Sequence, residues 1–316
     1  MKTEPVEKIH GSEKSMSFAI GSTAYLAPIG LEDALEKELK EITARYERLF
    51  VAKGPPQKVY FAQNIWLNPQ TIFFDSISDA ARKLRSLSGL WSFYPYQNPR
   101  RGELITGQLP YFLPKKLPFP ASLPTSQLGS WTLLDSHTLF ASPHCSSPFA
   151  HGEVHFKESR IPPSRAYLKL WELFTRIGKW PKKNDRCLEI GASPGGWTWV
   201  LQQFGACVTA VDRAPLDPAV AALSNITSLK QDAFSILPSG GQDFDWILSD
   251  VVCYPDKLLG WILKWLQAKP EMQFICTIKF QGHDDYGIIQ KFEEIRGGRV
   301  IHLFHNKHEL TFFRVV

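Results

Sequence analysis

The stretch RCLEIGASPGGWTW, residues 186–199, turns from an apolar run into a glycine-rich segment and back. Residues 187–190 are typical of a buried strand, and residues 197–201 restart in a helical pattern. The glycines between them allow a backbone to approach a ligand closely, and the next helix begins just beneath that ligand. A strand, a glycine-rich turn and a helix in this order therefore predict the nucleotide pocket of an open α/β sheet.

Apolar runs and helical patterns alternate through the rest of the C-terminal half. We expect strands at 206–211, 226–229, 244–250, 272–278, 299–304 and 309–315, and helices at 166–174, 218–223, 257–267 and 285–295. We expect the last two strands to pair with each other in antiparallel orientation. This order predicts an α/β, Rossmann-like, doubly wound sheet that is mostly parallel and has an antiparallel last strand.

The N-terminal half combines short strand-like runs with two helical patterns. We expect strands at 18–20, 23–26, 59–62 and 71–74, helices at 31–42 and 78–84, and a hairpin at 131–134 and 138–141. The first part of this order predicts an α+β, ferredoxin-like unit. We therefore expect a flexible start at 1–16, an N-terminal region at 17–150 and a second domain at 151–316.

Aromatic, basic and proline residues are mixed between residues 91 and 130. Examples are WSFYPYQNPRR at 91–101 and YFLPKKLPFP at 111–120. Prolines at this density disfavour regular helix or central strand, so we expect an extended connector. It could strap apolar side chains onto a neighbouring domain, or it could stack bases and contact phosphates of RNA.

Composition places few limits on function. A net charge of +5 permits a polyanionic partner without requiring one. The five cysteines are scattered without a C-x-x-C pair, and His283, His302, His305 and His308 show no ligand spacing, so we expect no metal and a reducing cytoplasm. The N-terminus has no secretory signal pattern, and no apolar run reaches the length of a membrane span.

Charged side chains follow several of the expected strands. Asp212 ends a strand about 20 residues after the glycine turn, where a carboxylate can accept both hydroxyls of an adenosine ribose. Asp232 ends the next strand and could meet an adenine amine. Asp250 and Lys279 end the two strands after that. Because such strand ends share one edge of the sheet, these residues predict an adenosine pocket.

The turn GASPGG departs from the G-x-G-x-x-G pattern of dinucleotide-binding proteins, because it contains a proline and lacks the third glycine. S-Adenosylmethionine has no pyrophosphate to cradle and tolerates a looser turn. The turn therefore favours S-adenosylmethionine over NAD, and an NAD-dependent dehydrogenase remains the alternative.

Residues 189–197, EIGASPGGW, resemble the first motif of the FtsJ-type ribose 2′-O-methyltransferases, and SRAYLKL at 164–170 resembles a segment just upstream of it. The resemblance covers roughly residues 160–316. It implies a methyltransferase fold that binds S-adenosyl-L-methionine through Ser164, Gly191, Ser193, Pro194, Gly195, Gly196, Trp197, Asp212, Asp232 and Asp250.

The whole chain resembles the RlmM group of that family, whose members methylate a cytidine ribose in 23S ribosomal RNA and carry an N-terminal RNA-binding THUMP region. The resemblance implies an rRNA substrate, met before ribosome assembly is complete. A non-catalytic RNA-binding protein that retains the fold is the alternative from a different functional class.

Members of the family use a lysine, aspartate, lysine, glutamate tetrad, and Lys169, Asp250, Lys279 and Glu309 match it in order. Lys279 is the expected base, because burial and the like charge of Lys169 lower a lysine pKa. Asp250 orients the amine, and Glu309 fixes Lys169 or the ribose. The alternative for Lys169 is the solvated face of its helix, which it shares with Glu172 and Arg176.

Overall fold

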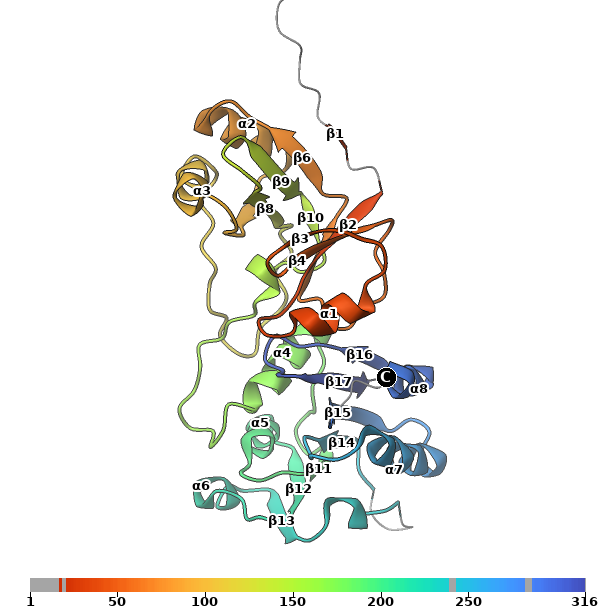
Figure 1. Ribbon diagram of the computed structural model, residues 1–316. Helices are drawn as coiled ribbons and strands as arrows, with labels where there is room; N and C mark the ends of the chain where they lie inside the picture. The colour runs from red at the N-terminus through yellow and green to blue at the C-terminus, as the bar shows by residue number, and fades with distance from the viewer. Residues whose placement is uncertain (1–16, 19–20, 239–242, 282–285, 316) are drawn as a thin grey trace, which may run out of the picture.

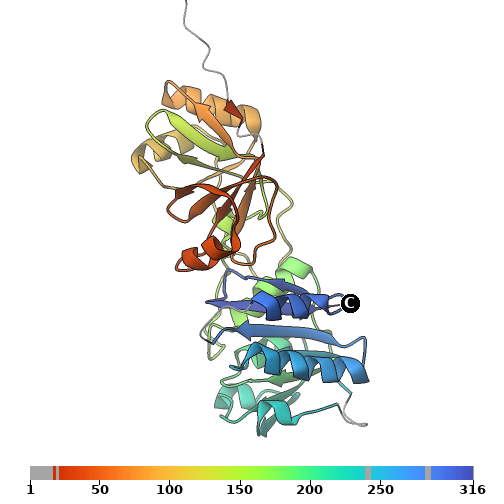
Figure 2. The same cartoon turned by 45° about the vertical axis from the view of Figure 1, so that its right-hand side comes forward.

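The computed structural model describes residues 17–18, 21–238, 243–281 and 286–315. The expected flexible start at 1–16 and His283 lie outside these residues. The described strands form three sheets. Figures 1 and 2 show two of them stacked above the third, with the N-terminal half of the chain in the upper pair.

The third sheet carries the C-terminal half and runs β13-β12-β11-β14-β15-β17-β16. Its strands are β11 (Arg186–Ile190), β12 (Cys207–Asp212), β13 (Ile226–Lys230), β14 (Trp246–Ser249), β15 (Gln273–Lys279), β16 (Arg299–Ile301) and β17 (Glu309–Arg314). The pairs from β13 to β15 are parallel, and β17 is antiparallel to both β15 and β16. The predicted doubly wound sheet is confirmed.

Helices cover both faces of this sheet. They are α4 (Tyr167–Ile177), α5 (Gly196–Gln203), α6 (Pro218–Ala221), α7 (Pro255–Ala268) and α8 (Tyr286–Glu294). Apolar residues of α4, α5 and α6 pack in one buried cluster, and those of α7 and α8 pack in another. The chain reverses its strand order between β11 and β14, so the loops after these two strands flank the crevice where such sheets bind ligands.

Two smaller sheets make up the N-terminal half. One contains β1 (Ser17–Phe18), β6 (Gln70–Phe73), β9 (Thr138–Ser142), β8 (Gly129–Leu133) and β7 (Trp91–Phe93). The other contains β10 (His144–Cys145), β5 (Asn64–Leu67), β2 (Ser22–Leu26), β4 (Leu49–Lys53) and β3 (Ile42–Tyr46). Helices α2 (Ile77–Leu87) and α3 (Pro99–Thr106) pack on the first of these sheets, and α1 (Glu32–Glu38) belongs to the second unit.

This arrangement corrects several expectations for the N-terminal half. The single ferredoxin-like sheet is wrong, because β2 and β5 lie in one sheet while β6 and α2 belong to the other. The first helix ends at Glu38, and Ile42 begins the strand β3. Residues 59–62 form no strand. The hairpin of β8 and β9 is confirmed.

The connector also differs in part from expectation. Residues 91–101 were expected to be irregular, yet Trp91 begins β7 at a sheet edge and Pro99 occupies the first turn of α3, where a missing N–H costs nothing. Further along, the Phe119 ring stacks on Trp171 of α4, with 4.6 Å between ring centroids. The segment around Phe119 thus packs against α4, whereas Tyr111 is 84% exposed.

The N-terminal half contacts the third sheet through Lys58, Tyr60 and Phe61. The Tyr60 hydroxyl donates to Glu293 Oε2 at 2.6 Å, and Lys58 forms an ion pair with the same carboxylate. The buried Phe61 ring lies 5.6 Å from the His308 ring. The apolar run at 59–62 thus supplies this interface.

Candidate active site

The turn between β11 and α5 requires glycine at defined places. Gly191 has a φ of +72°, and a Cβ there would lie 2.6 Å from Val251 Cα. A Cβ on Gly196 would lie 2.5 Å from Ser164 Oγ, so Ser164 packs directly against the turn. The close approach of the turn to its neighbours therefore depends on the missing side chains.

Asp212, at the end of β12, holds the turn in place. One carboxylate oxygen accepts from the Ser193 backbone N–H at 3.0 Å, and the other accepts from the Ala214 N–H at 2.9 Å. The predicted acid after the glycine turn thus lies directly beside it.

A first cavity of about 440 Å³ is lined by residues at or after the ends of β11, β12, β13, β14 and β15. Three of the expected cofactor residues line it: Gly191, Asp212 and Asp232. Asp232 pairs with Arg213 and accepts from the Phe234 N–H at 2.9 Å. The other expected cofactor residues do not line this cavity. Trp197, for example, is buried and donates from its indole to Ala166 O at 2.9 Å.

One wall of the first cavity was not predicted from the sequence. The segment 251–254 follows Asp250 directly and lines the cavity, together with Phe234 and Lys257. The Lys257 ammonium lies 4.3 Å from the centre of the Phe234 ring. The position of this segment directly after a strand end could have indicated that it lines the cavity.

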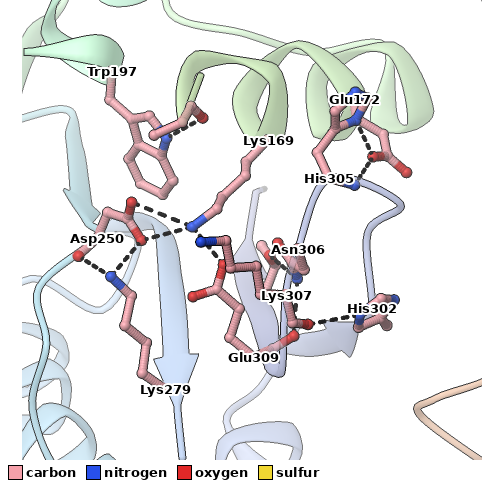
Figure 3. Close-up of polar contacts among 12 residues, drawn as sticks. Lys169, Glu172, Trp197, Asp250, Lys279, His302, His305, Asn306, Lys307 and Glu309 are labelled. Atoms are coloured by element: carbon pink, nitrogen blue, oxygen red, sulfur yellow. Dashed lines mark hydrogen bonds and ion pairs between the residues drawn. The ribbon is translucent and has the colours of Figure 1, made fainter. Parts of the chain in front are cut away.

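The four predicted tetrad residues meet although they are far apart in sequence (Figure 3). Lys169 Nζ, on the first turn of α4, lies 3.1 Å from Asp250 Oδ1 and 2.5 Å from Glu309 Oε1. Lys279 Nζ lies 3.0 Å from Asp250 Oδ1 and donates to the Asp250 backbone carbonyl at 2.5 Å. Lys279 and Glu309 are register partners in the antiparallel pair β15–β17, which explains their proximity.

The tetrad side chains are largely shielded from solvent, with exposures from 9% for Glu309 to 19% for Lys279. Burial alone would lower the pKa of Lys169, but Asp250 and Glu309 outweigh it and hold that pKa above its usual value. Lys169 therefore remains an ammonium ion. The alternative of a solvated helix face is wrong, because Glu172, on the same face, is completely buried.

A second cavity, of about 740 Å³, lies on the other side of Asp250. Lys169, Lys279 and Glu309 contribute to its wall. Further charged and aromatic side chains complete it, among them Lys116, Arg165, Lys307, His155, Phe156 and His305. Asp250 thus lies between a first cavity lined by two acids and two cations and a second cavity in which cations outnumber acids.

Glu189 is a buried acid on β11, two residues before Gly191. The Thr198 hydroxyl donates to its Oε2 at 2.6 Å. Burial, and after it the nearby Asp250 and Asp212 carboxylates, raise the pKa of Glu189 to about 8. Glu189 entered the sequence analysis only as a motif position.

Of the C-terminal histidines, His302, His305 and His308 lie in the described part of the chain. His305 Nδ1 lies 2.8 Å from Glu172 Oε2, and His302 Nε2 lies 3.0 Å from Lys307 O. His308 lies against Phe61. Within residues 17–18, 21–238, 243–281 and 286–315, no group of three His, Cys, Asp or Glu residues could hold a metal. No helix in that part of the chain is long and apolar enough to cross a membrane.

A comparison with known families agrees with this geometry. Residues 162–283 match the model of the FtsJ-like methyltransferase family. The match includes the glycine turn and three tetrad residues, and Glu309 lies beyond it. The resemblance of the C-terminal half to FtsJ-type enzymes is confirmed.

Curated relatives carry the name ribosomal RNA large subunit methyltransferase M. The protein from Halorhodospira halophila is 30% identical over 187 residues, which cover 57% of this chain and 55% of the relative. That from Edwardsiella ictaluri is 33% identical over 146 residues, covering 41% of this chain and 38% of the relative. The chain thus spans about half the length, or less, of the curated relatives it matches.

Solved structures also resemble the chain. The crystal structure of TrmN from Thermus thermophilus covers 93% of this chain and 99% of its own, with 14% identity and a TM-score of 0.37.

Proposed function

We propose that this protein transfers the methyl group of S-adenosyl-L-methionine to a ribose 2′-hydroxyl of RNA, with 23S rRNA as the favoured substrate. The observation that carries the proposal is the meeting of Lys169, Asp250, Lys279 and Glu309 between the two cavities. The family match and the names of the relatives support the same reaction.

The first cavity fits an adenosine cofactor. Its volume of about 440 Å³ is within the range of small-molecule sites, and its carboxylates suit hydroxyl and amine donors. Asp212 would hold the ribose and Asp232 the adenine amine. Ser164 and the turn from Ser193 to Trp197 would support that wall. The cofactor supplies an electrophilic methyl group on a sulfonium, whose leaving group is a neutral thioether.

Lys279 is the proposed base for the acceptor hydroxyl. A 2′-hydroxyl is a poor nucleophile until its proton leaves, and a neutral amine at Lys279 would accept that proton. Lys169, which Asp250 and Glu309 hold as an ammonium ion, shares Asp250 with the proposed base. Asp250 fixes the Lys279 amine through its side chain and its backbone carbonyl, which positions the base for the acceptor.

The second cavity and the N-terminal half are the proposed RNA-binding surfaces. Lys116, Arg165 and Lys307 line the cavity beside the tetrad, where they suit a polyanion. In this proposal residues 17–150 hold the RNA and residues 151–316 transfer the methyl group. The reaction would take place in the cytoplasm, on rRNA that is not yet fully assembled into a ribosome.

The test is methyl transfer to unmodified 23S rRNA, transcribed in vitro, from S-adenosylmethionine labelled in its methyl group. We expect label in an alkali-resistant dinucleotide, because 2′-O-methylation blocks cleavage at that position. A fragment with a 2′-deoxynucleotide at the mapped site is the matched control and should accept no label.

Two outcomes would contradict the proposal. Tight binding of NAD without binding of S-adenosylmethionine would favour a dehydrogenase. Binding of RNA without methyl transfer to any rRNA fragment would favour a non-catalytic RNA-binding protein. Mapping 2′-O-methylation in rRNA from cells with and without the gene would then identify the nucleotide.

A further inference from the structure

A buried carboxylate on α4 organises one wall of the second cavity. Glu172 lies three residues after Lys169 and has no exposed surface. Its oxygens accept from the backbone N–H groups of Phe304 and His305, each at 3.0 Å, and from His305 Nδ1 at 2.8 Å. Arg176 donates to it at 2.9 Å. Glu172 therefore ties the loop between β16 and β17 to the helix that carries Lys169 (Figure 3).

These contacts keep Glu172 ionised. Burial alone would raise the pKa of Glu172, and the hydrogen bonds and charges of His305 and Arg176 outweigh it, so that its pKa lies below the usual value. A buried carboxylate that accepts this many hydrogen bonds is costly to replace. Glu172 therefore does more than fill space beneath the loop between β16 and β17.

The orientation of His305 follows from this anchor. Nδ1 faces an acceptor and carries a proton, which leaves Nε2 as the variable nitrogen of the ring. His305 lines the second cavity and packs beside Phe156 and Phe304, with ring centroids 5.8 and 5.1 Å away. Its side chain is 11% exposed, so the ring is held in place and still reaches the cavity.

The chemistry of the acceptor determines what must enter this cavity. In RNA the 2′-hydroxyl and the 3′-phosphate are on adjacent ribose carbons, so a phosphate accompanies the reacting oxygen. Lys169 Nζ is already paired with Asp250 and Glu309, and Asp250 also holds Lys279, the proposed base. The phosphate therefore needs a donor outside the tetrad.

We propose that His305, positioned by Glu172, binds a backbone phosphate next to the acceptor ribose through a protonated Nε2. This inference rests on the proposed RNA substrate. With Nδ1 bonded to the Glu172 carboxylate, Nε2 is the ring nitrogen that can donate to a phosphate in the second cavity. His305 thus contributes to RNA affinity and register, and Lys279 remains the base.

The test compares RNA binding and turnover of His305→Gln with those of the wild type. We expect the RNA Kd and KM to rise about tenfold, as for loss of one charge-assisted hydrogen bond, with kcat at saturating RNA within about twofold. The slope of log affinity against log salt should fall in magnitude by about 0.7, the value for one phosphate contact of a single strand. Lys264→Gln, which removes an exposed positive charge on α7 outside both cavities, is the control and should keep the wild-type slope.

Glu172→Gln tests the positioning role. It should lower the salt slope as His305→Gln does, and the double variant should lose no more RNA affinity than Glu172→Gln alone. Circular dichroism would establish that each variant is folded. If either variant is not folded, the His305 ring nitrogen resonances of the wild type should shift on addition of an RNA fragment and stay unchanged with S-adenosylmethionine alone.

The inference is overturned if folded His305→Gln keeps the wild-type RNA affinity and salt slope, if it loses kcat with unchanged RNA affinity, or if the ring resonances do not respond to RNA. These results differ from failure of the proposed function, in which the wild type itself transfers no methyl group to RNA.

Discussion

The two cavities on either side of Asp250 are built in different ways. The first is formed by a glycine turn and by residues at or after the ends of five consecutive strands, all within residues 191–281. The second draws on segments as distant as Lys116, Lys169, Lys279 and Glu309. The first cavity is thus a product of one local motif and its sheet, whereas the second requires the tertiary structure of most of the chain.

The cavities also differ in the balance of their charges: acids and cations are equal in number in the first, whereas cations outnumber acids in the second. Asp212 and Asp232 give the first cavity the acceptors that an adenosine with a cationic sulfonium needs. Lys116, Arg165 and Lys307 give the second cavity the donors that a phosphate backbone needs. A substitution in one cavity should therefore affect one ligand and spare the other.

Lys279→Ala should give the largest effect on catalysis. Loss of the base should lower kcat by about 10³-fold, and the Kd for S-adenosylmethionine should change less than about twofold. Single-turnover methyl transfer and calorimetry measure the two quantities. Lys264→Ala, on the exposed face of α7, is the matched control. Unchanged methyl transfer in Lys279→Ala would contradict the assigned base.

Gly191→Ala should affect the first cavity. A Cβ 2.6 Å from Val251 Cα, at a φ of +72°, should cost about 2–4 kcal/mol of unfolding free energy and weaken cofactor binding more than RNA binding. Gly260→Ala makes the same chemical change within α7, where a Cβ has open space, and should stabilise by about 0.5–1 kcal/mol. Equal denaturation midpoints for the two variants would argue against the close approach.

Glu309→Gln should have a smaller effect, confined to the second cavity. Lys169 would lose one of the two carboxylates that keep it charged, so kcat should fall about tenfold with unchanged cofactor affinity. Glu271→Gln, at a carboxylate that is 74% exposed, is the control. A larger loss than in Lys279→Ala would reverse the assigned order of roles.

Glu189→Gln should leave activity least changed but alter how stability depends on pH. With a pKa of about 8 against 4.5 when unfolded, folded Glu189 binds a proton that the unfolded chain releases between these pH values. Stability from this group is therefore present below pH 4.5 and lost by about 1.4 kcal/mol per pH unit up to pH 8. Denaturant titrations at pH 5, 6.5, 8 and 9 should show a flatter profile in the variant, and parallel profiles would contradict it.

The sequence was sufficient to predict the third sheet because each strand and helix there has a clear period and ends in a recognisable residue. The N-terminal half was harder to predict. The apolar run at 59–62 signals burial, and in the structure Phe61 is buried at the interface with the C-terminal half instead of in a strand. Ile42 continued a helical spacing but is 37% exposed in β3. Periodicity predicts that a residue contacts something apolar, and only the tertiary structure determines what that is.

The same reasoning applies to the site. The tetrad could be predicted from residue order and strand ends, and the structure brings its members within contact distance. The role of Glu172 could not be predicted, because an acid one turn after Lys169 is typical of a solvated face. Its burial depends on the loop at 304–305, which arrives 132 residues later in the sequence. The pattern of charged and apolar residues around Glu172 does not indicate a partner this distant in sequence.

Asp250 connects the two cavities by a single peptide. Its carboxylate and carbonyl bind the lysines of the second cavity, and the next residue, Val251, lines the first. If binding of one ligand moves this peptide, the resulting coupling free energy acts equally on the binding of both ligands, by thermodynamic linkage. If bound cofactor tightens RNA binding by some factor, bound RNA must tighten cofactor binding by the same factor. Spent cofactor that relaxes the peptide would in the same way favour release of the methylated product.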